Sequence, residues 1–360
     1  MVNKKINSNS FSVIGFLLSE IGLGTAARNI VHALKCANLP TNCVNAHLEG
    51  RANNQGFASE CSPYKPGSIN FVVCGLDLVG SFYQKIQKSG SGIKNYLYPF
   101  WELDKLPYSK FEELSYYDEI IAPSSFIANA LSDFLGKDIK TIPLPVQIPN
   151  TVLPNNIQDG ILRIYSSLDF DSTVARKNPQ GVLDSFKIAF PANYDDVELI
   201  LKVRGVNDLG AREMLRAYAA RDSRIRIIDE TLSPNEMDKL VGICNIYLSL
   251  HRSEGFGLGP AEALACEKIV VSTDYGGTTD FINPNTGYPV NFKLMPVKPG
   301  EYPFWENQLW AEPSIESAAS SLMDIYDHYD RALERAKNGR ELMLNQHSFK
   351  VAGQRMKALL

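Results

Sequence analysis

The sequence predicts an α/β protein with two doubly wound, parallel-sheet domains. Three observations support this prediction. Short apolar runs of strand length alternate with helical segments, and this alternation occurs on both sides of the proline- and asparagine-rich stretch TIPLPVQIPNTVLPNNIQDG, residues 141–160. The chain has 360 residues, 44% of them hydrophobic and 21% charged, which is enough for about two domains. Repeated β–α units of this kind form parallel sheets with helices on both faces.

The predicted elements follow one another in a regular order. In the first half, the strand candidates are FSVIGFLL, INFVVCGL, KNYLYPF and DEIIAPS, and the helix TAARNIVHALKCANL follows a glycine turn. In the second half, the strands are LRIYSSLD, VELILKVRG, RIRIIDE, CNIYLSL and KIVVST, separated by helices such as NPQGVLDSFKIAF and SPNEMDKLVGI. We expect one domain over residues 1–148 and a second over residues 160–340. Ligands of such sheets bind at the carboxyl ends of the strands, so the cleft between the domains is the expected site.

Composition excludes several classes of protein. The net charge of -4 argues against a dedicated nucleic-acid binder. The six cysteines show no spacing typical of metal ligands, which predicts buried thiols in a reducing cytoplasm. FSVIGFLL is too short to span a bilayer, and the N-terminal residues lead into a strand rather than a secretion signal. We therefore expect a cytoplasmic protein.

The stretch HRSEGFGLGPAEALACEKIVVST, residues 251–273, carries the main functional signal. Glu254 and Glu262 flank a glycine-rich turn, and Pro260 suits the first position of the helix that follows. Backbone amides at a helix N-terminus favour an anion, whereas ionised carboxylates accept hydrogen bonds from hydroxyl groups. A ligand with both phosphates and hydroxyls is a nucleotide sugar. The alternative is that Glu262 only favours the helix dipole and that Glu254 is a solvated loop residue.

The segment EGFGLGPAEALACEKIVVSTDYGG resembles the donor-site motif of retaining glycosyltransferases of family 4, which have the GT-B fold. SEIGLGTAARNIVHAL, FWELDKLP with DEIIAPSSFIANAL, and RKNPQGVLDSFKIAF match the same family in the same order. The resemblance implies two Rossmann-like domains facing each other across a cleft, with the C-terminal helix, residues 341–360, crossing back to the first domain. It is strongest to members that build bacterial surface polysaccharides such as lipopolysaccharide, often mannosyltransferases.

The resemblance also implies roles for individual residues. Glu262 would bind the ribose hydroxyls, Glu254 would lie near the donor sugar, and Lys177 beside Arg176 would neutralise the donor diphosphate. The remaining candidates are the loop residues Gly255, Phe256, Gly257 and Leu258, the donor-side residues Gly24, Lys202 and His251, and the acceptor-side residues Trp101 and Glu102, which stand where many relatives have a histidine. No metal and no cofactor are expected, because cations and helix dipoles stabilise the leaving diphosphate in such enzymes.

Several of these residues have a second, structural interpretation. Gly24 could belong to a tight turn, Trp101 to the core, and His251 to a packed strand end. Trp305 and Trp310 could line an acceptor groove, but we favour an anchoring role in a loop. Asp169 and Asp171 mimic an Asp–X–Asp metal signature, which we interpret as a chance match.

The predicted function is retaining transfer of a hexose, mannose being one candidate, from a nucleotide-diphosphate sugar to a glycan or lipid-linked glycan. Two alternatives stay open: a GT-B sugar-nucleotide epimerase, and a nicotinamide-dependent oxidoreductase, which the incomplete glycine pattern at Gly22 and Gly24 disfavours. Lys85, Lys88 and Lys94 could support peripheral contact with the inner face of a membrane.

Overall fold

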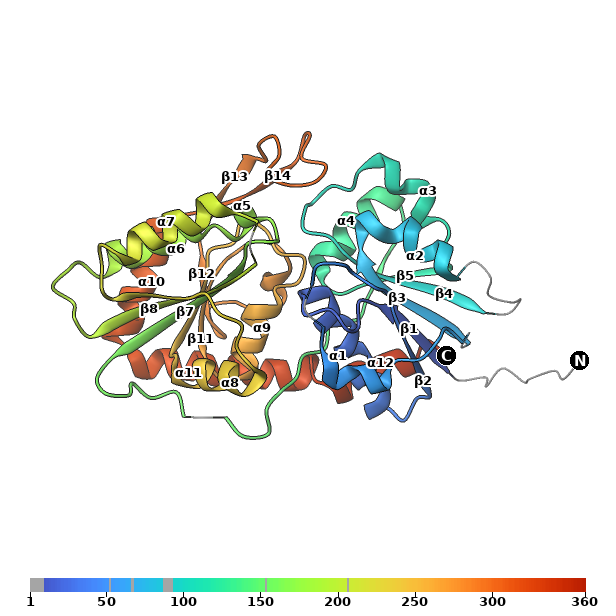
Figure 1. Cartoon of the computed structure of the whole chain (residues 1–360), viewed down its shortest axis with the longest axis horizontal. Helices are drawn as coiled ribbons and strands as arrows, with labels where there is room; N and C mark the ends of the chain where they lie inside the picture. The colour runs from blue at the N-terminus through green and yellow to red at the C-terminus, as the bar shows by residue number, and fades with distance from the viewer. Residues whose placement is uncertain (1–9, 52, 66–67, 87–92, 153, 206) are drawn as a thin grey trace, which may run out of the picture. The chain divides into compact units, whose positions relative to one another are not determined.

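The computed structural model describes residues 10–51, 53–65, 68–86, 93–152, 154–205 and 207–360 (Figure 1). The chain divides into two compact units. The first comprises residues 1–147 and 345–360, and the second comprises residues 148–344. Each unit contains its own six-stranded parallel sheet, and among the described residues no sheet runs through both halves of the chain.

The first unit is built around the strand order β2-β1-β3-β4-β5-β6. Its strands are β1 (Phe11–Gly15), β2 (Thr41–Asn45), β3 (Ile69–Gly75), β4 (Lys94–Phe100), β5 (Glu119–Ala122) and β6 (Lys140–Thr141). Its α-helices are α1 (Gly22–Cys36), α2 (Val79–Ile86), α3 (Phe111–Leu114), α4 (Ser125–Leu135) and α12 (Phe349–Lys357), with short 3-10 turns η1 (Gln55–Glu60), η2 (Leu76–Leu78) and η3 (Tyr108–Lys110). Although α12 is last in the sequence, it packs against α1, where the rings of Phe349 and His32 lie 5.4 Å apart.

The second unit has the strand order β12-β11-β10-β7-β8-β9. Its strands are β7 (Leu162–Asp169), β8 (Val197–Arg204), β9 (Ile225–Ile228), β10 (Ile246–Ser249), β11 (Ile269–Thr273) and β12 (Tyr288–Val290), followed by the hairpin β13 (Phe292–Pro296) and β14 (Leu309–Pro313). Its helices are α5 (Val174–Lys177), α6 (Pro179–Ala189), α7 (Leu209–Ala219), α8 (Pro234–Ile243), α9 (Leu258–Ala265), α10 (Ile315–Asp327) and α11 (Tyr329–Gln346), with the 3-10 turn η4 (Gly277–Asp280).

The strand order of the second sheet determines where a ligand can bind. Starting from one edge, the strands lie in the order β9-β8-β7-β10-β11-β12. This is the doubly wound order, in which the direction of the chain across the sheet reverses between β7 and β10. Loops that leave two neighbouring strands in opposite directions open a crevice at the carboxyl ends of those strands. The loops after β7 and β10 are therefore the expected ligand-binding loops of this unit.

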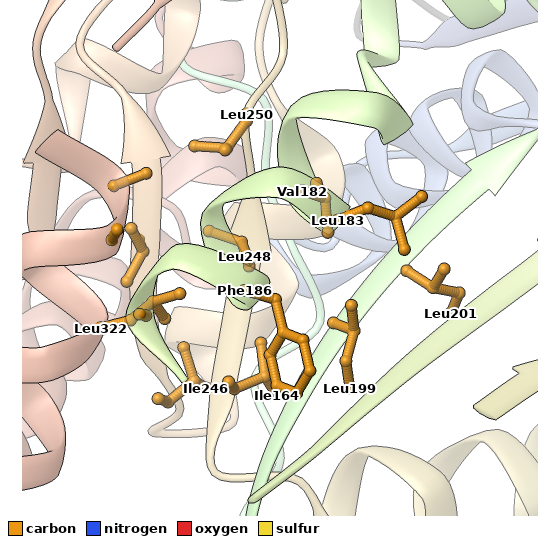
Figure 2. Close-up of a cluster of buried hydrophobic side chains, with 14 of the residues drawn as sticks. Ile164, Val182, Leu183, Phe186, Leu199, Leu201, Ile246, Leu248, Leu250 and Leu322 are labelled. Carbon is orange, nitrogen blue, oxygen red and sulfur yellow. The ribbon is translucent and has the colours of Figure 1, made fainter. Parts of the chain in front are cut away.

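A continuous apolar core supports this sheet. Figure 2 shows Phe186 of α6 directed toward Ile164 of β7 and Leu199 of β8, with Leu248 of β10 nearby. Leu322 of α10 belongs to the same cluster, and both helices pack on this face. Strands buried on both faces need continuous apolar sequence, which explains why VELILKVR and CNIYLSL could be recognised from composition alone.

Two expectations about local structure are wrong in detail. The helix after the first glycine turn begins at Gly22, so the GLG segment forms the first turn of α1 rather than a turn before it. All six cysteines are free, but only Cys43, Cys74 and Cys244 are buried. Position explains the second error, because Cys36, Cys61 and Cys266 lie at the C-terminal ends of α1, η1 and α9, where a side chain is less completely covered.

Candidate active site

The first part of the site is the turn Arg176-Lys177-Asn178-Pro179, which follows β7. The short helix α5 ends where Asn178 takes a left-handed conformation with φ of 50°, and Pro179 is the first residue of α6. The Asn178 side chain caps α6 by accepting a hydrogen bond from the amide of Gly181 at 3.2 Å. Asparagine tolerates this conformation and proline suits a first helical position, so the local sequence produces the sharp turn. As a result, both cations lie at the carboxyl end of β7.

The second part is Glu254, which lies in the loop after β10 and contacts both cations. One carboxylate oxygen accepts a hydrogen bond from Lys177 Nζ, and the other lies 3.1 Å from Arg176 Nη1. Arg176 Nη1 also donates to the carbonyl oxygen of Ser253 at 2.8 Å. The side chains of Glu254 and Arg176 are 9% and 7% exposed, whereas that of Lys177 is 29% exposed. Lys177 is therefore the member of this triad that can most readily reach a ligand.

The two cations of the triad explain why the carboxyl group of Glu254 stays ionised. Burial alone would raise the pKa of Glu254, but Lys177 and Arg176 outweigh it and hold this pKa well below its usual range. Glu254 is thus ionised at every physiological pH. Two cations and one carboxylate leave a formal charge of about +1 in the cluster, and such a cluster favours an anionic ligand.

Two glycine-rich loops pack backbone against backbone around Glu254. The amide of Gly277 donates to the carbonyl oxygen of Glu254 at 2.7 Å. Gly276 has a φ of +86°, and a Cβ atom there would lie 2.5 Å from the same oxygen. Only glycine fits this position without displacing the loop that carries Glu254. The contact was not expected from the sequence, where the only signal is the pair of glycines after β11.

The third part is the N-terminus of α9. This helix begins at Leu258, and its N-cap residue Gly257 has a φ of 90° and makes no side-chain capping hydrogen bond. Pro260 is the third helical residue, so its predicted place at the first position is wrong. The cause is the left-handed Gly257, which starts the helix two residues early. The amides of the first turn that precede Pro260 point out of the helix, toward the carboxyl ends of the strands, where the helix dipole favours negative charge.

Two tyrosines and a serine line the floor beneath α9. Tyr247 of β10 lies against Gly259, because a Cβ atom at that glycine would be 2.3 Å from the Tyr247 hydroxyl oxygen. The same hydroxyl lies 3.0 Å from Ser167 Oγ of β7, and the Tyr165 ring contacts the Tyr247 ring at 5.4 Å. Burial raises the pKa of Tyr247, so its hydroxyl stays protonated. Glu262 is exposed on α9, and its negative charge adds to the effect of burial in raising the pKa of both tyrosines.

His251 occupies the end of β10 as a packed residue. Its side chain is fully buried, and both ring nitrogens have partners: Ser249 Oγ at 3.0 Å and the carbonyl oxygen of Tyr275 at 3.0 Å. Burial lowers the pKa of His251 to about 4, so the ring is neutral near pH 7. This geometry favours the packed interpretation, in which His251 holds the Tyr275 loop in place beside Glu254.

The donor-side candidate Lys202 and the two aspartates of the Asp–X–Asp match are occupied by contacts within the protein. Lys202 is buried, and its Nζ donates to the carbonyl oxygen of Val203 at 2.8 Å. Burial and the nearby Arg204 lower the pKa of Lys202. Asp169 pairs with Arg204 at 2.9 Å, and Asp171 accepts from the amide of Asn207 at 3.2 Å. Within the described part of the chain, no group of three or more His, Cys, Asp or Glu residues is placed to hold a metal ion.

The candidates in the first unit differ from one another. Trp101 is 3% exposed, and its Nε1 donates to the carbonyl oxygen of Lys105 at 2.9 Å, as a core residue would. Glu102 beside it is only partly buried and stays the acceptor-side candidate. Gly24 is buried in the first turn of α1, where a Cβ atom would lie 2.0 Å from the carbonyl oxygen of Ser19. Gly24 therefore permits close packing of the loop after β1.

Comparisons with known proteins agree with this architecture. Residues 172–294, which include both glutamates and both cations, match the family model described as Glycosyl transferases group 1. No curated protein matches the chain in sequence. A glycosyltransferase from Rickettsia africae has a similar structure, with a TM-score of 0.71 and 15% identity over 98% of each chain.

Two further structures were solved with nucleotides. HepE of Anabaena, in complex with UDP and glucose, has a TM-score of 0.67 and 12% identity, covering 98% of this chain and 99% of that one. A TarM variant of S. aureus, in complex with fondaparinux, alpha-GlcNAc-glycerol and UDP, has a TM-score of 0.57 and 18% identity. The match covers 81% of this chain and 54% of TarM, so the chain spans about half the length of that protein.

These findings define the class of protein. The predicted fold is confirmed: the chain has the GT-B type of α/β structure, with two parallel six-stranded sheets. The family match over residues 172–294 and the fold together support a glycosyltransferase. At these identities the structural likeness carries the fold alone, so the donor and acceptor have to be argued from the site.

Proposed function

We propose that this protein is a retaining, metal-independent glycosyltransferase that moves a hexose from a nucleoside-diphosphate sugar to a glycan or lipid-linked glycan. One observation carries the proposal. The buried Glu254 lies between Arg176 and Lys177, beside the N-terminus of α9, at the carboxyl ends of the two strands where the sheet order reverses. The cations and the helix terminus suit a diphosphate, and the carboxylates suit hydroxyl groups.

The proposed roles follow from exposure. Lys177, being partly exposed, binds the diphosphate and stabilises the charge that develops as it leaves. Arg176 is buried and orients Glu254 while adding positive potential. Glu254 faces the donor sugar, whose ring gains positive character during transfer, and the exposed Glu262 holds the ribose hydroxyls. The floor formed by Tyr247 and Ser167 lies beneath the nucleotide. This division of labour needs no cation other than those of the protein.

The alternatives are less compatible with this geometry. A nicotinamide-dependent oxidoreductase of this strand order would need a glycine-rich turn after the first strand of the sheet, but the turn after β7 is DSTVARKNP. An epimerase would use the same nucleotide site, but its chemistry needs no acceptor. The two remaining candidates therefore differ in one measurable property, the acceptor dependence of nucleotide release.

A donor screen followed by product analysis tests the proposal. Thermal-shift measurements with UDP-, GDP-, ADP- and dTDP-sugars would identify the base, since only a donor that binds the folded state raises the melting temperature. Transfer is then followed by release of the nucleoside diphosphate with and without a glycan acceptor, and the anomeric configuration of the product is assigned by NMR. Formation of an epimeric nucleotide sugar without any acceptor would support the epimerase instead, and an inverted product would contradict retention.

A lipid-linked acceptor would bring the first unit to a membrane surface, and we propose that α2 and α3 make this contact. No described helix is long and apolar enough to cross a bilayer. Tyr108 and Phe111 are 83% and 47% exposed beside α2, which carries the exposed Lys85. Lys94 is exposed at the start of β4, whereas Lys88 lies outside the described residues. Aromatic side chains and lysines suit an anionic lipid surface.

Vesicle sedimentation tests the membrane contact. We expect the protein to co-sediment with vesicles that contain phosphatidylglycerol and to remain in solution with vesicles of phosphatidylcholine alone. The Phe111→Ser variant should weaken the co-sedimentation, because Phe111 supplies apolar area at the proposed surface. Equal sedimentation of the protein with and without anionic vesicles would contradict the contact and would leave the proposed transfer reaction intact.

A further inference from the structure

Arg252, one residue after His251, connects the turn that carries Arg176 and Lys177 to the β13–β14 hairpin. Its guanidinium Nη1 donates to the carbonyl oxygen of Ala175 at 2.7 Å, and its backbone amide donates to the carbonyl oxygen of Arg176 at 2.7 Å. Its Nε and Nη2 donate to the Glu312 carboxylate at 2.7 and 3.3 Å. No role for Arg252 was anticipated from the sequence.

The hairpin holds Arg252 from the other side. The amide of Ala311 donates to the carbonyl oxygen of Arg252 at 2.9 Å, and the guanidinium lies 5.7 Å from the ring centre of Trp310. Trp310 is fully buried, so it provides a rigid surface. The side chain of Arg252 is 19% exposed, and that of Glu312 is 38% exposed. The guanidinium is therefore fixed by a carboxylate, an aromatic ring and a backbone carbonyl at the same time.

The need for such an anchor follows from the length of α5. A helix of four residues cannot be stable by itself, since helix formation needs several turns to offset nucleation. Its last carbonyl groups have no partners within the helix unless another group supplies them. Arg252 supplies partners to two of them, those of Ala175 and Arg176. Arginine near a helix C-terminus also interacts favourably with the negative end of the helix dipole.

We infer that Arg252 is a positioning residue for the reaction: it sets the orientation of Arg176 and Lys177 by anchoring the C-terminal end of α5 to the β13–β14 hairpin. The inference rests on the proposed function for its kinetic consequences, but the anchoring itself does not. It also gives the hairpin a role, because Trp310 and Glu312 are the parts of the hairpin that hold the anchor. Trp310 thus acts as a support for Arg252 rather than as a surface for an acceptor.

Three variants separate the contacts of Arg252. Arg252→Ala removes every side-chain contact. Arg252→Lys keeps the charge but cannot reach Ala175 and Glu312 together, because a lysine has one donor group instead of a fork. Glu312→Gln keeps the contact with Ala175 and weakens only the link to the hairpin. The matched control is Glu198→Gln, which removes a carboxylate that pairs with Arg163 and Arg226 near the start of β8, at the amino ends of the strands of the same sheet.

Hydrogen exchange in the absence of ligand tests the anchoring. The amides of Arg176 and Asn178 are bonded to the carbonyl oxygens of Thr173 and Val174 at 3.2 and 3.1 Å. We expect these amides to exchange at least about 10-fold faster in Arg252→Ala and at unchanged rates in Glu198→Gln, because local opening of α5 costs less when its C-terminal end is free. Unchanged exchange in Arg252→Ala would overturn the inference, whatever reaction the protein catalyses.

Binding and kinetics test the positioning role. The probes are inorganic pyrophosphate, which does not depend on the base, and the nucleoside diphosphate selected by the donor screen. For Arg252→Ala we expect about 10- to 100-fold losses in both affinity and kcat, because small misplacements of a catalytic group can cost about 100-fold. We expect the losses in Arg252→Lys to be intermediate. The affinity and kcat of Glu312→Gln should stay within about threefold of the unchanged protein. Equal losses in Arg252→Ala and Glu198→Gln would mean that Arg252 acts only on stability.

The two proposals fail in different ways. If the protein is not a glycosyltransferase, the unchanged protein shows no acceptor-dependent release of nucleotide, while exchange at Arg176 and Asn178 still increases in Arg252→Ala. If the inference is wrong, the unchanged protein transfers the sugar and the Arg252→Ala variant transfers it equally well.

Discussion

Glu254→Gln is the most informative single change, because it removes one charge from the triad and almost no volume. Glu254 is the buried partner of both Arg176 and Lys177, so the formal charge of the cluster changes from about +1 to +2. Removing one member of a buried ion pair costs about 3–5 kcal/mol. We expect the lower end, about 3 kcal/mol, because Lys177 can turn toward water and Arg176 keeps its hydrogen bond to Ser253.

The same change should separate nucleotide binding from catalysis. In the unliganded protein Lys177 is bonded to Glu254, and a diphosphate has to compete for it. A charge-assisted hydrogen bond contributes about 1.5–3 kcal/mol, so removing the competitor should tighten binding of the nucleoside diphosphate by about 10-fold. We also expect kcat to fall on the order of 100-fold, because a carboxylate near the donor sugar interacts most strongly with the positive charge of the transition state.

The reference variant is Glu262→Ala. Its hydrogen bonds to the ribose would exist before and during the reaction, so we expect KM for the donor to rise roughly 10- to 150-fold with little change in kcat. Calorimetry with the nucleoside diphosphate alone, together with steady-state kinetics, distinguishes the two variants. Equal losses of nucleotide affinity in Glu254→Gln and Glu262→Ala would refute the assignment of these glutamates to the sugar and the ribose.

The remaining predictions concern the cations, metal independence, the histidine and the glycine contact. Lys177→Ala should lower both kcat and diphosphate affinity, because the diphosphate that Lys177 binds is charged before the reaction and more so during it. Steady-state kinetics with calorimetry would check this, and an unchanged affinity would contradict it. Transfer should continue in EDTA, because the triad and α9 already supply positive charge; loss of transfer that Mg²⁺ or Mn²⁺ restores would contradict metal independence. The pKa of His251 is lowered in the folded state to about 4, so between about pH 6.5 and 4 the imidazole binds a proton in the unfolded chain but not in the folded one. The free energy of unfolding should therefore fall by roughly 3 kcal/mol as the pH decreases through this window. Urea unfolding at several pH values would measure this loss, which should be smaller in His251→Gln. Gly276→Ala should shift the Glu254 loop, lowering kcat and the melting temperature together, which kinetics and thermal unfolding would show; an unchanged kcat would mean that the loops tolerate a Cβ atom.

The sequence by itself determined the fold class and the main residues of the candidate site. Apolar runs such as VELILKVR and the alternation of strands with helices predict two parallel sheets, because strands buried on both faces need continuous apolar sequence. The segment EGFGLGP and the turn RKNP carry local signals, since glycine and proline free or restrict the backbone at defined positions. The glycine-rich turn by itself marks Glu254 and Glu262 as candidates, whereas Arg176 and Lys177 became candidates through the resemblance to a known family.

Only the tertiary structure decided which of these groups touch. Glu254 and Lys177 are separated by 77 positions in the sequence, and their contact depends on the reversal of strand order between β7 and β10. Likewise, the burial of His251 and Trp101 could not be predicted, because an aromatic or imidazole side chain at a strand end can point into the core or away from it. The roles of Gly276 and Arg252 depend on backbone atoms of distant loops. A contact between backbones leaves almost no trace in the pattern of side chains, and for this physical reason it is determined only when the chain folds.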